Sequence, residues 1–518
     1  MTPPGPGRIL ACLLAAALAL AAAALAPTGC SRPAPRATAC VWLMGRDEPT
    51  FDPDGPPDPW RWALERMLTR GLVEEDSTGR IVPAAAERFE LSPDSLTFTF
   101  HLRPGLRFTD GSPCRSADFR RALEGGLNRR DHATRAWLLA AVRGVDRVRA
   151  GKPLPEIGIE TPDDGTLMIR LTRPDTLFLR RLALPGVGDA WTGRTAGSWN
   201  ESRGLGPYRV AGAEPGRRLT LVRARTAAGT AAGADSVTVR FGLPVGRARS
   251  LMRAGAPDLV WPIPAGLLSE TLPGGYRWTA RPAAPQRRLL LVMRADLPPT
   301  SKLAARHALA HGLNRGELQG SLGPLGQELA VWLKGAERFE FPSLDPGEVQ
   351  RWMEQGRLGR SFHVVMAYDP EGPAGMAARM LQGEWARYAI YVELLPLRGR
   401  RLTTELLEGR AHLLLVDAQS SLDDAAAELV SLVMPLRGPA VGSFRTGWRT
   451  REFDAWLAPR RAGSPLPVVE AQRRLEEELI VLPLVRLPWI WVERAGGAGA
   501  PFHPHFGPGC PAPAAAAR

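Results

Sequence analysis

Few residues in this sequence have types and spacings that suggest catalysis or metal binding. His307 and His311 lie four positions apart in a stretch with helical periodicity, so both imidazoles can lie on one face, as in some zinc sites. Such a site needs a third ligand and outer-shell support, and the sequence shows neither. His503 and His505 lie in a Gly/Pro/Ala-rich tail that starts near Ala495 and is expected to be loose. We therefore expect no metal and no cofactor.

Signatures of catalysis are absent from the sequence. The acidic pairs Asp163-Asp164 and Asp423-Asp424 are more typical of turns and helix starts than of acid/base dyads. No G-x-S-x-G or H-E-x-x-H motif occurs, and Gly151-Lys152 is followed by proline rather than by the Ser or Thr of a phosphate loop. The chain is therefore predicted not to be an enzyme, with an exported hydrolase kept as a remote alternative.

The first half of the chain has the pattern of a mixed α and β fold. Strict alternation from Leu96 to Leu102 predicts a half-buried strand, Pro104-Gly105 a turn, and Leu106–Phe108 the start of a returning strand. Ser116 is expected to cap a helix with Phe119, Ala122, Leu123 and Leu127 at helical spacing. Further strands are expected at Leu167–Leu171, Leu219–Val222 and Val237–Phe241.

The second half alternates strands and helices more regularly. Strands are predicted at Phe362–Tyr368, Ile390–Leu395 and His412–Val416, and helices at Gly375–Tyr388 and Leu402–Leu407. This order implies parallel strands joined by right-handed crossovers. Because ligands bind beyond the carboxyl ends of such strands, the segment from Arg401 to Asp424 is expected to approach a cleft. A helix near Pro467–Leu479 precedes the apolar stretch Ile480–Val492.

The N-terminus has the layout of an export signal. Arg8 precedes 18 uncharged, mostly apolar residues, Ile9–Ala26, and Pro27-Thr28-Gly29-Cys30 follows. A small residue before cysteine resembles the lipobox of bacterial lipoproteins, in which the cysteine is lipidated. The resemblance implies lipidation at Cys30 and a mature chain on the outside of the membrane; ordinary cleavage and an uncleaved anchor are alternatives. Ser31–Thr38 is then a flexible tether.

The remaining cysteines and the charge narrow the class of protein. Cys40, Cys114 and Cys510 allow one disulfide at most, for example Cys40 with Cys510, and buried unpaired thiols are the alternative. Of the 66 basic residues only three are lysines, and the formal net charge is +13. The arginines are scattered rather than gathered into a stripe, which argues against a nucleic-acid partner.

A long ordered set of motifs resembles family 5 of the bacterial extracellular solute-binding proteins, the oligopeptide-, dipeptide- and nickel-type receptors of ABC importers. The most specific match is the stretch from Ile81 to Pro113, with Leu102-Arg103-Pro104-Gly105-Leu106-Arg107-Phe108 at its centre. Other matches are Glu48–Pro53, Arg70–Val73, Thr161–Asp175, Gly204-Leu205-Gly206-Pro207-Tyr208 and Arg306–Arg315, and they extend from about residue 41 to 495. Leu205, Gly312 and Asn314 depart from the family pattern.

The resemblance implies an α/β fold: a two-lobed clamp of the periplasmic-binding-protein type II with an extra α+β subdomain. The implied division is a signal peptide (1–29), a tether (30–40), lobe I (41–80 with 191–290 and 486–505), the subdomain (81–190), lobe II (291–485) and a disordered tail (506–518). A solute would bind between the lobes, and closure would present the loaded, monomeric receptor to ABC permease subunits. The implied location is the periplasm or cell surface, with a lipid anchor in the membrane.

Ligand residues follow less directly from the resemblance. Peptide-binding members use an aspartate to hold the peptide ammonium, and Ser420 lies at that position, with Asp417 as a nearby substitute. Glu48 and Thr50 match the strand that lines the cleft, and Trp191 is a further candidate. The loss of the aspartate leaves a second hypothesis open, in which a degenerate clamp acts as a sensor or interaction protein.

Overall fold

The structure is a computed structural model, and the described residues belong to the larger of its two compact units, residues 39–518. It describes residues 39–49, 59–127, 138–148, 153–190, 199, 203–224, 234–268, 271–283, 287–329, 331, 338–398, 401–402, 405, 409–419, 468–496, 500–503 and 505–509. The export signal, Cys30 and the predicted helix at Leu402–Leu407 fall wholly or partly outside these ranges. None of the described helices has the length and apolar character needed to cross a bilayer.

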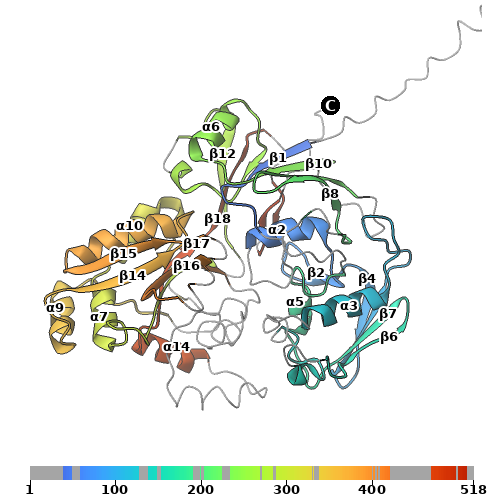
Figure 1. Cartoon of the computed structure of the whole chain (residues 1–518), viewed down its shortest axis with the longest axis horizontal. Helices are drawn as coiled ribbons and strands as arrows, with labels where there is room; N and C mark the ends of the chain where they lie inside the picture. Colours follow the sequence, from blue (N-terminus) through green and yellow to red (C-terminus); the bar gives the residue numbers. More distant parts are fainter. Residues whose placement is uncertain are drawn as a thin grey trace, which may run out of the picture. The chain divides into compact units, whose positions relative to one another are not determined.

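Seven of the described strands form a mixed sheet in the order β12-β18-β11-β1-β10-β9-β8. Strand β1 lies parallel to both β10 and β11, whereas β9, β18 and β12 join antiparallel (Figure 1). The carboxyl ends of β1, β10 and β11 therefore share one edge. The bounds are β1 Ala39–Leu43, β8 Tyr208–Glu214, β9 Arg218–Arg223, β10 Ser236–Arg240, β11 Leu259–Val260, β12 Tyr276–Arg281 and β18 Trp489–Arg494.

A second sheet has the order β15-β14-β16-β13-β17. The parallel strands of the predicted β-α-β-α-β segment and its first helix are confirmed here, because β14 is parallel to both β15 and β16 and helix α10 packs against these strands (Figure 1). The second predicted helix, Leu402–Leu407, stays a prediction. Antiparallel β13 and β17 extend the sheet, and every residue of β13 is buried. The bounds are β13 Arg287–Met293, β14 Phe362–Tyr368, β15 Ile390–Pro396, β16 Leu413–Gln419, β17 Val481–Leu487 and α10 Pro373–Ala386.

A four-stranded antiparallel sheet, β4-β5-β7-β6, carries the most specific sequence motif. Strand β5 alternates partly and fully buried residues, which confirms the half-buried strand expected from its alternation. The predicted returning strand at Leu106–Phe108 is wrong: only an isolated bridge joins Arg107 to Pro113, and β4 and β7 flank β5 instead. The bounds are β4 Ala86–Leu91, β5 Thr97–Leu102, β6 Ile159–Asp163, β7 Thr166–Arg170, α3 Ser116–Leu127 and α5 Phe178–Leu182.

The remaining described elements cover these sheets or form short hairpins. Hairpin β2–β3 spans Val73–Glu75 and Ile81–Pro83, and β19–β20 spans Phe502–His503 and Gly507–Pro508. The other helices are α2 Pro59–Leu68, α6 Val245–Arg253, α7 Leu303–His311, α8 Arg315–Leu322, α9 Pro346–Gln355 and α14 Val468–Glu477, with 3₁₀ turns η1 Val145–Arg147, η2 Ala265–Leu267 and η3 Gly323–Leu325.

Three clusters of buried apolar side chains hold the described residues together, one at each large sheet. The cluster at the five-stranded sheet also contains Leu43, Val260 and Val492 from the seven-stranded sheet, so the apolar core is continuous between these two sheets. The apolar stretch predicted at Ile480–Val492 explains part of this link. It forms β17 in one sheet and β18 in the other, with Pro488 between them.

The two described cysteines, Cys40 and Cys114, differ in state: one is in a disulfide and the other is a free thiol. Cys40 is disulfide-bonded, and its predicted partner Cys510 lies outside the described residues. Cys114 is a buried free thiol, and burial raises its pKa well above the ordinary value, so it stays protonated and unreactive.

Candidate functional site

The carboxyl ends of strands in the two large sheets are joined by an ion pair. Arg46 follows β1, Asp369 follows β14, and Arg46 Nη2 lies 2.7 Å from Asp369 Oδ2. Both side chains are largely withdrawn from solvent. Because ligands in α/β folds bind beyond strand carboxyl ends, this is where the topology favours a ligand.

The acids beside this ion pair are held in a partly dry environment. Burial raises the pKa of Asp369, and the neighbouring carboxylate Asp417 raises it further, against the opposing effects of Arg46 and the Glu371 amide. Burial also raises the pKa of Glu371, whose carboxylate accepts a 2.7 Å hydrogen bond from Arg398. The strand ends therefore hold alternating positive and negative groups rather than one sign of charge.

A second ion pair lies on the five-stranded sheet itself. Arg287 begins β13 and donates from Nε to Asp417 Oδ1 on β16 at 2.7 Å, while its Nη2 contacts Asp417 Oδ2. Its Nη1 also donates to the Pro488 carbonyl at 3.2 Å. Arg287 is only 5% exposed, so its guanidinium is desolvated, and the bidentate geometry of the pair fixes it against Asp417.

Tryptophans surround the two arginines. The Arg287 guanidinium lies 4.7 Å from the Trp489 ring centroid and 5.4 Å from that of Trp60, and Arg46 lies 5.5 Å from Trp60. Trp60 and Trp489 both meet Trp261 edge-on. We call Arg46, Trp60, Arg287, Asp369 and Asp417 the strand-end cluster. It combines aromatic faces with both signs of charge, which suits a solute that has polar and apolar parts.

The sequence-predicted ligand residues divide between this cluster and other places. Asp417 belongs to the cluster, whereas Glu48 Oε2 accepts the Gly216 amide at 2.5 Å and so fixes the turn between β8 and β9. Burial raises the pKa of Glu48, and this hydrogen bond opposes the rise. The candidates Thr50, Trp191 and Ser420 lie outside the described residues. Their roles stay predictions.

Sequence reasoning missed Arg46, Trp60, Arg287 and Asp369. Asp369 could have been found, because it follows the correctly predicted strand Phe362–Tyr368 and the strand-end rule applies to it directly. Arg46 lies two residues before Glu48, inside a segment already singled out. Arg287 and Trp60 had no local signal, since each is defined by partners more than a hundred residues away.

The histidine pair on α7 has a packing role. His307 stacks on Trp352 with ring centroids 4.0 Å apart, and burial lowers its pKa to about 4. His311 Nδ1 lies 3.0 Å from the Ser343 carbonyl. Within the described ranges, no group of three or more His, Cys, Asp or Glu side chains is arranged to hold a metal ion.

Comparison with known proteins decides the family. The sequence model described as "Bacterial extracellular solute-binding proteins, family 5 Middle" matches residues 80–433, well over half of the chain. The chain belongs to this family. Its fold is thus the predicted two-lobed α/β clamp of the family, with the extra α+β subdomain.

Named relatives match parts of this family 5 chain. The periplasmic oligopeptide-binding protein OppA of Haemophilus influenzae is 30% identical over 164 residues, which are 28% of this chain and 30% of that protein. The glutathione-binding protein GsiB of Salmonella typhi is 26% identical over 309 residues, which are 57% of this chain and 56% of that protein. The chain thus spans 30% and 56% of these two relatives' lengths.

Solved structures agree on the fold along most of the chain. The Escherichia coli murein tripeptide binding protein MppA has a TM-score of 0.77 at 17% identity and covers 92% of this chain and 97% of its own. The agropinic acid complex of AgaA from A. tumefaciens R10 has a TM-score of 0.73 at 20% identity, with 90% and 96% covered. At these identities the likeness concerns the fold alone.

Proposed function

We propose that this family 5 protein is an exported receptor of an ABC importer. It binds a peptide or similar small solute between two lobes and delivers it, as a monomer, to membrane permease subunits. The proposed lobes are residues 41–80 with 191–290 and 486–505, and residues 291–485, with a subdomain at 81–190. The four-stranded sheet supports the last of these, since β4 to β7 all lie between Ala86 and Arg170.

The observation that carries the proposal is the ion pair between Arg46 and Asp369. It links residues that follow the carboxyl ends of β1 and β14, which belong to different sheets, through a 2.7 Å contact between Arg46 Nη2 and Asp369 Oδ2. A solute between the sheets would meet the partly exposed charges of the strand-end cluster, on Arg46, Asp369 and Asp417, with the buried Trp60 ring behind them. These groups fit a ligand with charged ends and an apolar body better than a purely apolar one.

The pair between Arg287 and Asp417 favours a second candidate function. Asp417 is the substitute that the sequence offers for the ammonium-binding aspartate, yet both of its carboxylate oxygens contact Arg287. A peptide ammonium would have to displace a bidentate guanidinium to reach it. The second candidate is therefore a clamp that does not take a free peptide N-terminus and acts as a sensor or interaction protein.

Ligand capture tests the proposal. Incubation of the purified protein with a library of di- to pentapeptides, followed by mass spectrometry of what is retained, is expected to yield bound peptides. At a hundredfold excess over Kd, a bound peptide should add about 2.7 kcal/mol to the free energy of unfolding and raise the melting temperature. The isosteric variant Asp369→Asn should retain less peptide, whereas His363→Gln, on an exposed part of β14, should retain as much as wild type.

The outcomes separate the candidates. Retention of peptides with free N-termini supports the import receptor. Retention of N-acetylated peptides alone supports the second candidate, and a library in which nothing binds or stabilises the protein contradicts the proposed receptor.

We further propose that Cys30 is lipidated and anchors the protein to the membrane outside the cell or in the periplasm. The small residue Gly29 and the preceding apolar segment support this. Replacing Cys30 by alanine is expected to move the protein from the membrane to the soluble fraction after fractionation. Cys114→Ala, at a buried thiol, is the matched control and should leave the protein on the membrane. A Cys30→Ala protein that stays on the membrane would mean an uncleaved anchor.

A further inference from the structure

Part of the predicted loose tail, residues 500–503 and 505–509, is packed against the rest of the described chain. Residues 500–503 and 505–509, here called the C-terminal strap, form β19 and β20, and His505 and Phe506 are 1% and 3% exposed. Gly507 has φ +79°, and a Cβ there would lie 2.5 Å from the Trp261 ring. The composition of this segment did not predict its packing. Its few aromatic side chains are buried and hold it in place, although most of the residues around them are Gly, Pro and Ala.

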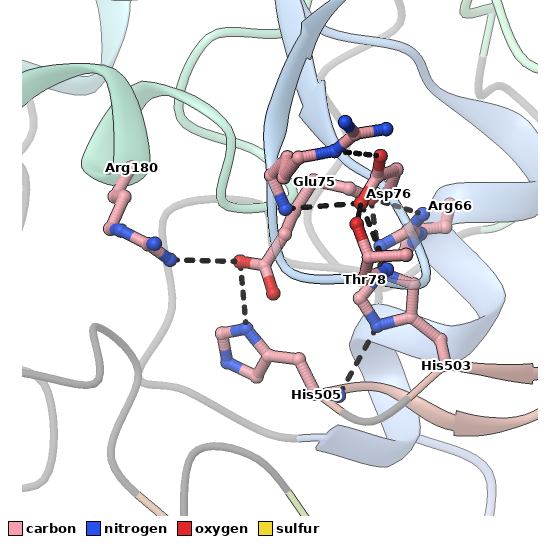
Figure 2. Close-up of polar contacts among 8 residues, drawn as sticks. Arg66, Glu75, Asp76, Thr78, Arg180, His503 and His505 are labelled. Carbon is pink, nitrogen blue, oxygen red and sulfur yellow. Dashed lines mark hydrogen bonds and ion pairs between the residues drawn. The ribbon is translucent and has the colours of Figure 1, made fainter.

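His503 is held in one neutral form by its two hydrogen bonds. Its Nε2 lies 3.0 Å from the Glu75 carbonyl, which can only accept, so Nε2 carries the proton (Figure 2). Its Nδ1 accepts the His505 amide at 3.2 Å. A proton on Nδ1 would set two donors against each other and break this bond. The strap thus fits the neutral imidazole and not the imidazolium.

Charged groups surround His503 on every element that packs there. His505 Nδ1 lies 3.4 Å from Glu75 Oε2, and Arg180 lies 3.9 Å from the same oxygen (Figure 2). Arg66 approaches from α2 and lies 4.2 Å from the Phe506 ring centroid. Among the described residues, Arg66, Glu75 and His505 act on His503 directly, and the charges that act on Arg66 and Glu75 in turn are those of Arg70, Glu74, Arg180 and Asp189. An imidazolium at His503 would therefore face a cationic Arg66 and lose its amide donor.

Helix α2 connects the strap to the strand-end cluster. Trp62 meets His505 and Phe506 edge-on at 5.9 and 6.0 Å, and Arg66, one turn along, stacks on Phe506. Trp60 of the same helix packs between the arginines of the strand-end cluster. A change in how the strap docks is thereby transmitted to the helix that carries Trp60.

We infer that the C-terminal strap is an acid-sensitive latch: protonation of His503 breaks its bond to the His505 amide, releases the strap from β2 and loosens α2. The latch is closed at neutral pH and opens in mild acid. It is independent of the identity of the solute and of the proposed import function.

The electrostatics around His503 also predict that the strap is released as the pH falls. Burial and the charge of Arg66 lower the pKa of His503 to about 4, from an ordinary value near 6.5. Between these values the docked strap binds fewer protons than the released one, so docking weakens as the pH falls through this window. Burial raises the pKa of Glu75, but its hydrogen bond with His505 and the charges of His505, His503 and Arg180 together lower this pKa below its ordinary value.

Hydrogen exchange tests the latch on the full chain. Peptides that cover residues 500–509 and 59–68 are followed by mass spectrometry at pH 7.5 and pH 5, with correction for intrinsic exchange. Protection of the strap is expected to fall on the order of tenfold at pH 5. Protection of α2 should fall with it, while the buried strand β13 serves as the internal reference. An unchanged strap at pH 5 overturns the inference.

Variants assign the response to His503. His503→Asn and His503→Gln place a neutral amide at this position, so the strap should stay protected from exchange at both pH values. If the strap of one variant is already unprotected at pH 7.5, the other variant is used for the comparison. His505→Gln and the exposed control His363→Gln should keep the acid response. The same tenfold fall in the docked His503 variants would place the trigger elsewhere and overturn the assignment.

Discussion

Replacing Arg287 by methionine is expected to lower the free energy of unfolding by about 3 kcal/mol, because it leaves the Asp417 carboxylate partly buried without its partner. Arg287 is 5% exposed and contacts both oxygens of Asp417. Its guanidinium also fills the space between the Trp60 and Trp489 rings. The Asp417 side chain keeps 23% exposure, so the cost should fall at the lower end of the range for broken buried pairs. Urea denaturation measures it.

Two further variants separate the charge from the packing. The double variant Arg287→Met with Asp417→Asn should recover part of the loss, because it removes the unpaired charge and keeps the apolar volume. Arg218→Met breaks an ion pair with Glu214 in which both side chains are about half exposed, and it should cost no more than about 0.5 kcal/mol. If Arg287→Met costs no more than Arg218→Met, the pair does not stabilise the joint between β13 and β16.

The sequence predicted the elements whose periodicity is local. Phe362–Tyr368 was placed at its observed bounds, and the half-buried strand before Pro104 was correct within a residue. The antiparallel neighbours β13 and β17 were missed as sheet members, because buried strands are continuous apolar runs that have no period of their own. Their partners lie across long stretches of chain, and no local pattern encodes such pairings.

The candidate site was predictable only in part, because its contacts also join residues that lie far apart in the sequence. The strand-end rule indicates the region, and Asp417 was identified within it. What Asp417 does was not predictable, since its pairing with Arg287 depends on the register of β13 against β16. The prediction for the C-terminal strap failed for a different reason. The composition of the strap predicts a loose chain, whereas the stacking of Phe502 on Trp491 and of Phe506 on His505 buries its aromatic rings, and composition does not reveal such contacts.

The substitution Gly206→Ala is expected to cost about 3 kcal/mol of stability, because there is no room for a side chain between this glycine and α2. A Cβ at Gly206 would lie 2.3 Å from the Leu68 carbonyl carbon and 2.6 Å from the Met67 oxygen, both backbone atoms. The Gly206 amide also donates to the Leu68 carbonyl at 3.0 Å and so satisfies an acceptor at the end of α2. Relief of the clash must move α2, which carries Trp60.

A glycine without such neighbours gives the matched comparison. Gly383 lies in the interior of α10, is exposed, and a Cβ there would meet no atom within 4 Å. Gly383→Ala should therefore stabilise the protein by about 0.5–1 kcal/mol through its better helix propensity. Melting temperatures of the two variants should move in opposite directions. Equal shifts would mean that α2 tolerates displacement, and the close approach of Gly206 would then not explain the glycine-rich family motif at residues 204–208.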